Sequence, residues 1–406
     1  MRLSVFPDLS TKDGVTDENA RMTNALKEVR AVGDMATIRP GLVTSAVSVG
    51  NGNGLVSFNG ELVSIFGASV GVPSADEVSI TSNSYNISGV VVLDTVKLGS
   101  YWLLMSDSQI YSTTDFVTFT PLLTPGLYFL FNPECFETNG TIAVIAVENE
   151  DGDIGNLVID TALTVTAHFD GVDNLAGSFL VWTGTKFVGS YGSILNSFST
   201  NGITWTLSSS YTAMFSSRFA YGNGIICQLG TPAASNDVNA IVSLDDGATW
   251  SSPVLLVSAA GSFSICWAGD RFVASGRDWV ATSTDGVSWS LIYPFPYNFS
   301  SVRIAYSSTA DTVLALGSYA YYGIPQTKML SFDNGLTWID ANESVYNGIE
   351  YSSCLADGNG FVTTGSTVVS GAANNIEVIG TVSVLGTITD LTSLTNSRHD
   401  FVQSPI

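Results

Sequence analysis

Two arginines are the first candidates for a functional site, because their residue type and their positions in the sequence would suit binding of an anionic substrate. Arg218 and Arg303 occupy similar places, each in an apolar, strand-like stretch that precedes a tight turn. A guanidinium group binds a carboxylate through two parallel hydrogen bonds, so convergent arginines would indicate a site for an anionic substrate. Solvated or paired structural arginines are the simpler interpretation of these two residues.

Clustered carboxylates are a second candidate. The run ENEDGD carries Glu148, Glu150, Asp151 and Asp153 near an expected turn. Calcium prefers oxygen ligands of this kind, but the run lacks the spacing of a defined calcium loop. We therefore favour a solvated turn and predict no metal site.

Histidines and cysteines give no stronger indication of chemistry. His168 and His399 are the only histidines and lie too far apart in sequence to suggest a catalytic pair. The cysteines lie in apolar stretches without a CxxC pair, so we expect buried free thiols rather than disulfides or a zinc site. We predict no catalytic residues, no cofactor and no enzymatic activity. The cysteines are Cys135, Cys227, Cys266 and Cys354.

Repeated hairpins must position any site that the chain contains. An apolar segment, a tight polar turn and a second apolar segment recur from residue 54 to residue 365, at an average spacing of about 43 residues. That spacing is typical of four-stranded propeller blades. The pattern predicts an all-β fold, an eight-bladed β-propeller, or a seven-bladed one if a terminal unit is irregular. The turns centre near Gly60, Gly99, Gly140, Thr185, Asn223, Asp270, Ala310 and Gly360.

A second motif follows several hairpins and ends in tryptophan. Its Asp or Asn can accept backbone N–H groups in a turn, its Gly can adopt a positive φ, and its Trp is expected to pack between blades. A degenerate copy, STTDFVTF, covers residues 112–119. The motif residues are Ser199, Asn201, Gly202, Trp205, Ser243, Asp245, Gly247, Trp250, Ser283, Asp285, Gly286, Trp289, Ser331, Asp333, Gly335 and Trp338.

These motifs resemble the Asp-box, or bacterial neuraminidase repeat. The resemblance implies a propeller with the motif on turns between outer strands, and it implies a structural role for the motif. Sialidases share the box and use three arginines, a Tyr–Glu pair and an Asp acid/base. Their Arg-Ile-Pro signature is absent here: Ile38-Arg39-Pro40 has a different order, and Gly323-Ile324-Pro325 has no arginine. We therefore expect no sialidase activity.

The two ends of the chain differ from the repeats. We predict an N-terminal arm over residues 1–42, a propeller over 43–390 and a polar tail over 391–406. Thr16 could cap a short amphipathic helix that Gly33 ends. The helix could pack on the propeller or dock on a neighbouring subunit, and the strand-like segment Leu42–Val49 could close the ring. The candidate docking residues are Met22, Leu26, Val29 and Arg39.

Three N-terminal segments carry a resemblance to a second family. Asn19–Asn24, Arg39–Leu42 and Gly52–Gly67 resemble the tail hub or nozzle proteins of short-tailed phages, known as packaged-DNA stabilisation proteins. The resemblance covers roughly the first 70 residues. It implies a structural virion protein in the phage tail, present as a ring of copies around the DNA exit channel and in contact with other tail or neck proteins.

Composition limits the remaining function classes. The net charge of −22 disfavours tight binding to nucleic acid or anionic lipid, although DNA could pass through a negatively charged tunnel without binding. We expect no sequence-specific nucleic-acid binding, no signal peptide and no membrane anchor. The alternative function is receptor or glycan binding by a propeller on a phage tail or a secreted protein, with Tyr319, Tyr321 and Tyr322 stacking on sugars.

Overall fold

The computed structural model describes residues 78–384 apart from several connecting segments, together with the backbone of short strands between Leu3 and Phe66. All of the regular elements in this part of the chain are strands. The chain divides into two compact units: Met1–Ser79 with Ser383–Ile406, and Ile80–Val382. This division differs from the sequence-based boundaries at residues 42 and 390.

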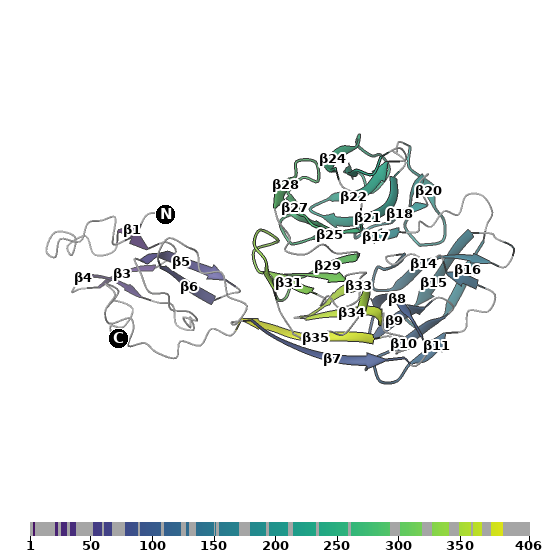
Figure 1. The fold of residues 1–406 in the computed structure, drawn as a ribbon, viewed down its shortest axis with the longest axis horizontal. Helices are drawn as coiled ribbons and strands as arrows, with labels where there is room; N and C mark the ends of the chain where they lie inside the picture. The colour runs from purple at the N-terminus through teal and green to yellow at the C-terminus, as the bar shows by residue number, and fades with distance from the viewer. Residues whose placement is uncertain are drawn as a thin grey trace. The chain divides into compact units, whose positions relative to one another are not determined.

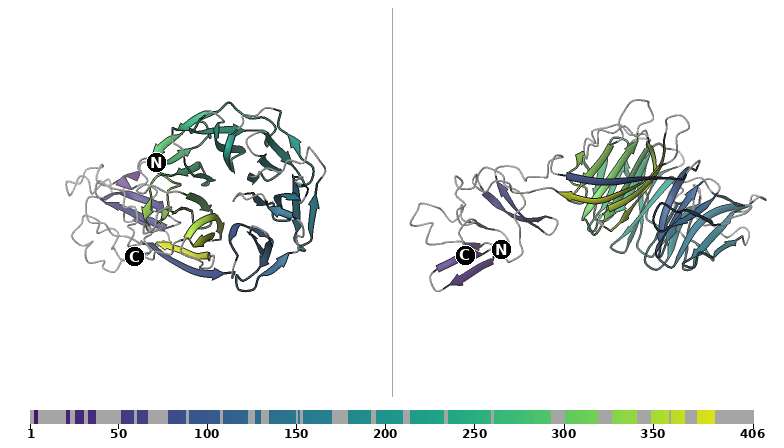
Figure 2. Two further views of the ribbon diagram at one scale, coloured as in Figure 1. Left: turned by 45° about the vertical axis from the view of Figure 1, so that its right-hand side comes forward. Right: turned by 90° about the horizontal axis from the view of Figure 1, so that it is seen from below.

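Seven antiparallel sheets arranged as blades around an axis make up the larger unit, which is a seven-bladed β-propeller (Figures 1 and 2). Each inner strand contacts the inner strands of both neighbouring blades, so the ring is closed. The inner strands are β8 (Val92–Leu98), β13 (Phe136–Thr138), β17 (Phe179–Trp182), β21 (Met214–Gly222), β25 (Phe263–Trp267), β29 (Ser301–Ser307) and β33 (Ile349–Asp357), and β12 (Leu127–Phe129) pairs with the same neighbour as β13.

The second strand of each blade pairs with the inner strand through a tight hairpin. These strands are β9 (Tyr101–Ser106), β14 (Ile142–Asn149), β18 (Phe187–Tyr191), β22 (Ile225–Pro232), β26 (Phe272–Gly276), β30 (Thr312–Ser318) and β34 (Gly360–Thr367). The third strands follow, and they are β10 (Ile110–Thr113), β15 (Ile154–Asp160), β19 (Leu195–Ser199), β23 (Val238–Ser243), β27 (Val280–Ser283), β31 (Thr327–Ser331) and β35 (Asn375–Val384).

The outer strands are short in six of the seven blades. In blades 1 to 6 they come directly after the third strand, whereas blade 7 takes its outer strand from the N-terminal side of the chain. The outer strands are β11 (Thr120–Leu122), β16 (Val165–His168), β20 (Thr206–Leu207), β24 (Val254–Val257), β28 (Ser290–Ile292), β32 (Ile339–Asp340) and β7 (Val78–Asn86).

An early strand closes the ring, as the sequence suggested. Strand β7 lies beside β35 at the outside of blade 7, so the blade combines strands from both ends of the larger unit (Figure 1). The segment that the sequence suggested could do so, Leu42–Val49, lies outside the described residues. The closing strand is β7, which comes immediately before the first strand of blade 1.

The blade count of eight was wrong, and the alternative of seven is correct. The hairpin near Gly60 consists of β5 (Gly52–Phe58) and β6 (Glu61–Phe66), which form a two-stranded sheet in the smaller unit. Its local sequence pattern is the same as that of a blade hairpin. Among the described residues no third and fourth strands follow it, since the next described strand, β7, belongs to blade 7.

The predicted N-terminal helix is a second correction. Backbone strands β3 (Leu26–Arg30) and β4 (Gly33–Thr37) form an antiparallel hairpin there, with Arg30 paired with Gly33. Met22 belongs to β2 (Arg21–Met22), which pairs with β1 (Leu3–Ser4). An isolated helix of this length is marginal in water, and a strand hairpin satisfies the same backbone groups through pairing.

The hydrophobic core consists of layers between adjacent blades. Middle strands are buried on both faces, as in β26, where all five residues of FVASG are buried. This double burial explains their almost continuous apolar sequences. Between blades 1 and 2, for example, Leu103 and Met105 pack with Ile145 and Leu157. No helix in the described part of the chain is long and apolar enough to cross a membrane.

Candidate functional site

The turns that end in tryptophan connect the third and outer strands, as the sequence predicted. In the turn of blade 5, Ser283 accepts the backbone N–H of Gly286 at 2.8 Å and donates its hydroxyl to Asp285 at 2.9 Å. Asp285 accepts the backbone N–H groups of Ser288 and Val287, and these bonds lower the pKa of its carboxyl to about 2. The turn is therefore stabilised by its own side chains.

The same bonds recur in blades 3, 4 and 6. In each turn, the serine hydroxyl accepts the glycine N–H at 2.7 to 2.9 Å, and the indole N–H of the tryptophan donates to the glycine carbonyl at 3.0 to 3.3 Å. Blade 1 has a degenerate copy in which Phe116 adopts φ 57° in place of glycine. The serine, acidic or amide, glycine and tryptophan positions predicted from the sequence thus act within each turn.

Each turn also packs against the preceding blade. A Cβ atom added to Gly335 would lie 2.6 Å from Cγ1 of Val273, which belongs to the second strand of blade 5. A Cβ atom added to each of the other three glycines would lie 2.5 to 2.9 Å from a valine of the preceding blade. These pairs are Gly202 with Val144, Gly247 with Val188, and Gly286 with Val242. The motif therefore stabilises the stacking of neighbouring blades. Its side chains have a structural role.

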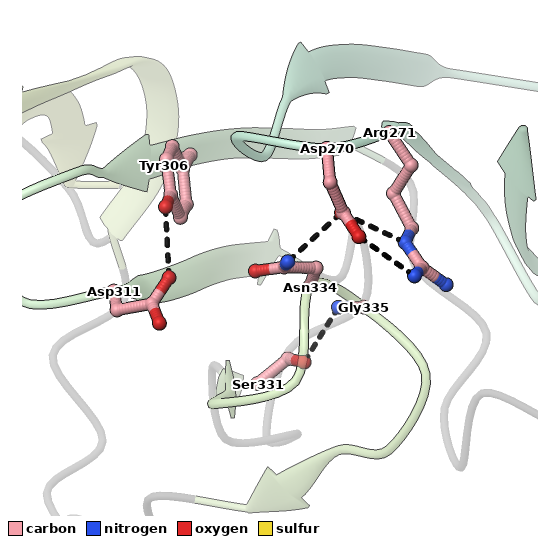
Figure 3. A network of polar contacts seen from close by, with 7 residues as sticks. All are labelled: Asp270, Arg271, Tyr306, Asp311, Ser331, Asn334 and Gly335. Atoms are coloured by element: carbon pink, nitrogen blue, oxygen red, sulfur yellow. Dashed lines mark hydrogen bonds and ion pairs between the residues drawn. The ribbon is translucent and has the colours of Figure 1, made fainter. Parts of the chain in front are cut away.

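Polar contacts join the inner hairpins of one blade to the turn of the next. In Figure 3, Asp270 lies between Arg271 of its own hairpin and Asn334 in the turn of blade 6, with Asn334 donating at 2.8 Å. Thr185 donates in the same manner to Asp246 of blade 4 at 2.9 Å. These contacts place the inner hairpins and the tryptophan turns on one face of the propeller.

Arg218 and Arg303 do not converge on a common site. Nε of Arg303 donates to the carbonyl of Ser352 in the inner strand of blade 7, and this side chain is buried. The guanidinium of Arg218 lies 4.6 Å from the ring centre of Phe179, in the inner strand of blade 3. Each arginine reaches sideways to a neighbouring inner strand, which supports the structural interpretation of both residues.

A buried ion pair joins blades 6 and 7. Nζ of Lys328 lies 2.5 Å from Oε1 of Glu377, and the side chains are 9% and 3% exposed. Sequence analysis missed this pair because its members lie in apolar strands of different repeats. Their separation of 49 residues is close to one repeat, which is the one signal that could have indicated it.

Glu137 is a second ionisable residue that sequence analysis missed. It lies in β13 and accepts the backbone N–H of Thr138 at 2.8 Å and that of Trp182 in blade 3. Burial outweighs these two hydrogen bonds and raises the pKa of its carboxyl to about 7. The folded protein therefore keeps Glu137 mostly protonated at mildly acidic pH, and the carboxyl loses its proton around neutral pH.

Wild type is expected to lose stability as the pH rises, because Glu137 must ionise in the folded chain. Glu137→Gln should not show this loss. Since the pKa is about 7 in the folded chain and near 4.5 when unfolded, the folded state binds more protons between these values. The stabilisation of the folded state by protonated Glu137 is complete below pH 4.5, and it is lost as the pH rises through 7. Urea unfolding at pH 5 and pH 8 should show the variant gaining about 2 kcal/mol over wild type at the higher pH.

A constant difference between the two proteins at both pH values would contradict this assignment. Glutamine keeps an oxygen that can accept the N–H of Thr138, so the substitution isolates the charge.

The remaining candidate residues do not form a site within the described residues. Of the acidic run, Asp151 is exposed, and no group of three or more metal-ligating side chains is found in the described chain. His168 lies in β16, whereas His399 lies outside the described residues. Arg39, Tyr319, Tyr321 and Tyr322 also lie outside them.

The expectation of thiols rather than disulfides is confirmed, because none of the four cysteines forms a disulfide. Cys135 and Cys227 are buried as expected, whereas Cys266 and Cys354 are half-buried. Burial raises the pKa of the thiols of Cys227, Cys266 and Cys354 well above the usual range. These thiols stay protonated at neutral pH and are poor nucleophiles.

Comparison with known proteins supports the fold. No family model and no curated protein matches the chain. YCF48 bound to D1 peptide is similar in structure, with a TM-score of 0.54 at 13% identity over 76% of this chain and 99% of that one. A catalytically inactive virginiamycin B lyase from Staphylococcus aureus with quinupristin has a TM-score of 0.55 at 8% identity, over 74% and 99% of the two chains. At these identities the likeness shows a β-propeller and nothing more specific.

Proposed function

We propose that this chain is a non-enzymatic β-propeller that works by binding other macromolecules, as a structural subunit of a phage tail. One observation supports a binding role over catalysis: the ionisable groups of the described inner strands and hairpins contact neighbouring blades and do not converge on a common site. Arg218, Arg303 and Asp270 each contact a neighbouring blade, so they stabilise the ring. A rigid ring of this kind presents surfaces and loops to partners, as propellers do.

The comparisons agree with a binding role. One similar propeller is described with a bound peptide and another, a lyase, with quinupristin. Both descriptions belong to those proteins, but they show that this architecture serves binding in different settings. The fold alone does not distinguish a binding module from an enzyme.

The tail assignment is supported by the sequence. Asn19–Asn24, Arg39–Leu42 and Gly52–Gly67 resemble tail hub or nozzle proteins, and the last of these segments forms the β5–β6 hairpin of the smaller unit. The net charge of −22 suits a protein that DNA passes without being bound. A ring of copies in contact with other tail or neck proteins is part of this proposal.

Immunolabelling of intact particles tests the tail assignment. Antibodies raised against the purified chain would be applied to phage particles released from cells that carry its gene, and the particles would be imaged by electron microscopy. We expect label at the tail, and preincubation of the antibody with purified protein should remove it. Unlabelled particles, with the protein recovered only in the particle-free fraction, would contradict a virion role and favour a free receptor- or glycan-binding protein.

A further inference from the structure

Asparagines that precede glycine are open to a spontaneous chemical change. The backbone nitrogen of the glycine can attack the side-chain carbonyl carbon of the asparagine, which forms a five-membered succinimide ring and releases ammonia. Water then opens the ring at either carbonyl and leaves aspartate or isoaspartate. Glycine favours the attack because no Cβ atom crowds its nitrogen. The structure describes the side chains of four such asparagines, which are Asn139, Asn201, Asn223 and Asn334.

Three of the four following glycines donate their N–H to a side chain of their own turn. Gly335 donates to Oγ of Ser331 at 2.7 Å. The proton of this N–H has to leave during the attack, so the hydrogen bond must break first. The corresponding bonds elsewhere join Gly140 to Oγ1 of Thr138 at 2.9 Å and Gly202 to Oγ of Ser199 at 2.9 Å.

The side-chain amides of the same three asparagines are also bonded. Nδ2 of Asn334 donates to Asp270 in the neighbouring blade at 2.8 Å. Oδ1 of Asn139 and Oδ1 of Asn201 each accept two backbone N–H groups, from the residues two and three positions further on, at 2.8 to 2.9 Å. Each amide would have to leave these partners to reach the glycine nitrogen. The reaction at these three asparagines therefore requires local opening of the turn.

Asn223 and Gly224 lack these restraints. They form the exposed two-residue tip of the hairpin between β21 and β22, with Gly222 and Ile225 paired on either side. Among the described residues, no hydrogen bond involves the side chain of Asn223 or the N–H of Gly224. Apart from its chain neighbours, no atom lies within 4 Å of the position that a Cβ atom of Gly224 would take. The nitrogen is therefore accessible to the amide carbon and to a base in solution.

We propose that Asn223 is a modification site, which converts to aspartate or isoaspartate faster than the other three asparagines. A C–N bond forms between Cγ of Asn223 and the nitrogen of Gly224. The proton of the Gly224 N–H passes through a solvent base to the departing amide, which leaves as ammonia. Water then adds to the ring. The product places a new negative charge on the face of the inner hairpins, and isoaspartate also lengthens the backbone of the tip. This inference goes beyond the proposed function and does not depend on it.

Incubation of the full-length protein at mildly alkaline pH tests this order of reactivity. Samples taken over several weeks would be digested, and mass spectrometry of the peptides would give the converted fraction at each asparagine. We expect Asn223 to convert about tenfold faster than the other three asparagines, because each of these must first lose hydrogen bonds. Enzymatic methylation of isoaspartate should label the peptide of Asn223 first. Equal rates at all four asparagines, or a slower rate at Asn223, would overturn the proposal.

The unfolded chain is a matched control, because the residue after each asparagine is glycine in all four cases. In guanidinium chloride the fold no longer protects any of them, so the four rates should become similar. An order of rates that persists in the unfolded chain would mean that local sequence sets it, and the proposal would fail.

Ser331→Ala tests the protecting hydrogen bond directly. The variant removes the acceptor of the Gly335 N–H, so Asn334 should convert faster, whereas the rate at Asn223 in blade 4 should stay the same. Slow conversion of Asn139 and Asn201 in the same sample would show that the propeller remains folded. An unchanged rate at Asn334 in the folded variant would count against protection by these bonds, on which the proposal rests.

Discussion

Gly335→Ala is expected to lower the free energy of unfolding of the propeller by about 3 kcal/mol. Two costs add at this residue. Its φ of +87° lies in the left-handed region, where a Cβ atom introduces strain of about 1 kcal/mol. The new methyl group would also lie 2.6 Å from Cγ1 and 2.8 Å from Cγ2 of Val273, in the buried layer between blades 5 and 6. Urea unfolding of the full chain, followed by tryptophan fluorescence, measures the change.

Gly140→Ala is the matched control for backbone strain. Gly140 has nearly the same φ, +86°, but no atom lies within 4 Å of the position that its Cβ would take. The control should cost only about 1 kcal/mol. In a Val273→Ala background, Gly335→Ala should cost about as much as the control, because the clashing methyl groups have been removed. Equal costs for Gly335→Ala and Gly140→Ala in the wild-type background would show that the turn does not press on the neighbouring blade.

The local features of the blades could be predicted from the sequence. Gly99, Gly140 and Asn223 were expected at hairpin turns, and all three adopt positive φ there. The hydrogen bonds of the turn containing Ser283 and Asp285 also follow from residue type, since their partners lie within a few residues. Local chemistry of this kind does not require knowledge of the three-dimensional arrangement.

The number of blades and the contacts between them could not be predicted in this way. The β5–β6 hairpin has the same pattern of apolar strand, turn and apolar strand as a blade, but within the described residues it forms a sheet of only two strands. Asp270 and Asn334 lie 64 residues apart, and they meet because blades 5 and 6 stack. The N-terminal segment was misassigned because Met22, Leu26 and Val29 fit a helical spacing, whereas the segment pairs as strands.

Blade 7 is the point where these long-range contacts matter most. Its strands come from both ends of the propeller, so covalent continuity alone does not close the ring. Two ion pairs tie it to its neighbours: Lys328 with Glu377 toward blade 6, and Lys97 with Asp357 toward blade 1. They differ in burial, because the side chains of the second pair are 43% and 34% exposed.

Lys328→Met is expected to cost about 3 to 5 kcal/mol of stability, because it leaves the buried carboxylate of Glu377 without its cation. Oε2 of Glu377 is already buried without a hydrogen-bond partner among the described residues, so little in the structure can compensate. The double variant Lys328→Met/Glu377→Met should recover most of the loss, since two apolar side chains can occupy the same layer.

Lys97→Met, which breaks the more exposed pair, should cost less than about 1 kcal/mol in the same urea unfolding experiment. A loss at Lys328 no larger than the loss at Lys97 would mean that water reaches Glu377 in the folded chain. A double variant no more stable than Lys328→Met alone would mean that Lys328 acts through contacts other than this carboxylate. The expected order, with a large loss only for the single variant at Lys328, would show that the buried pair between blades 6 and 7 stabilises the ring more than the exposed pair between blades 7 and 1.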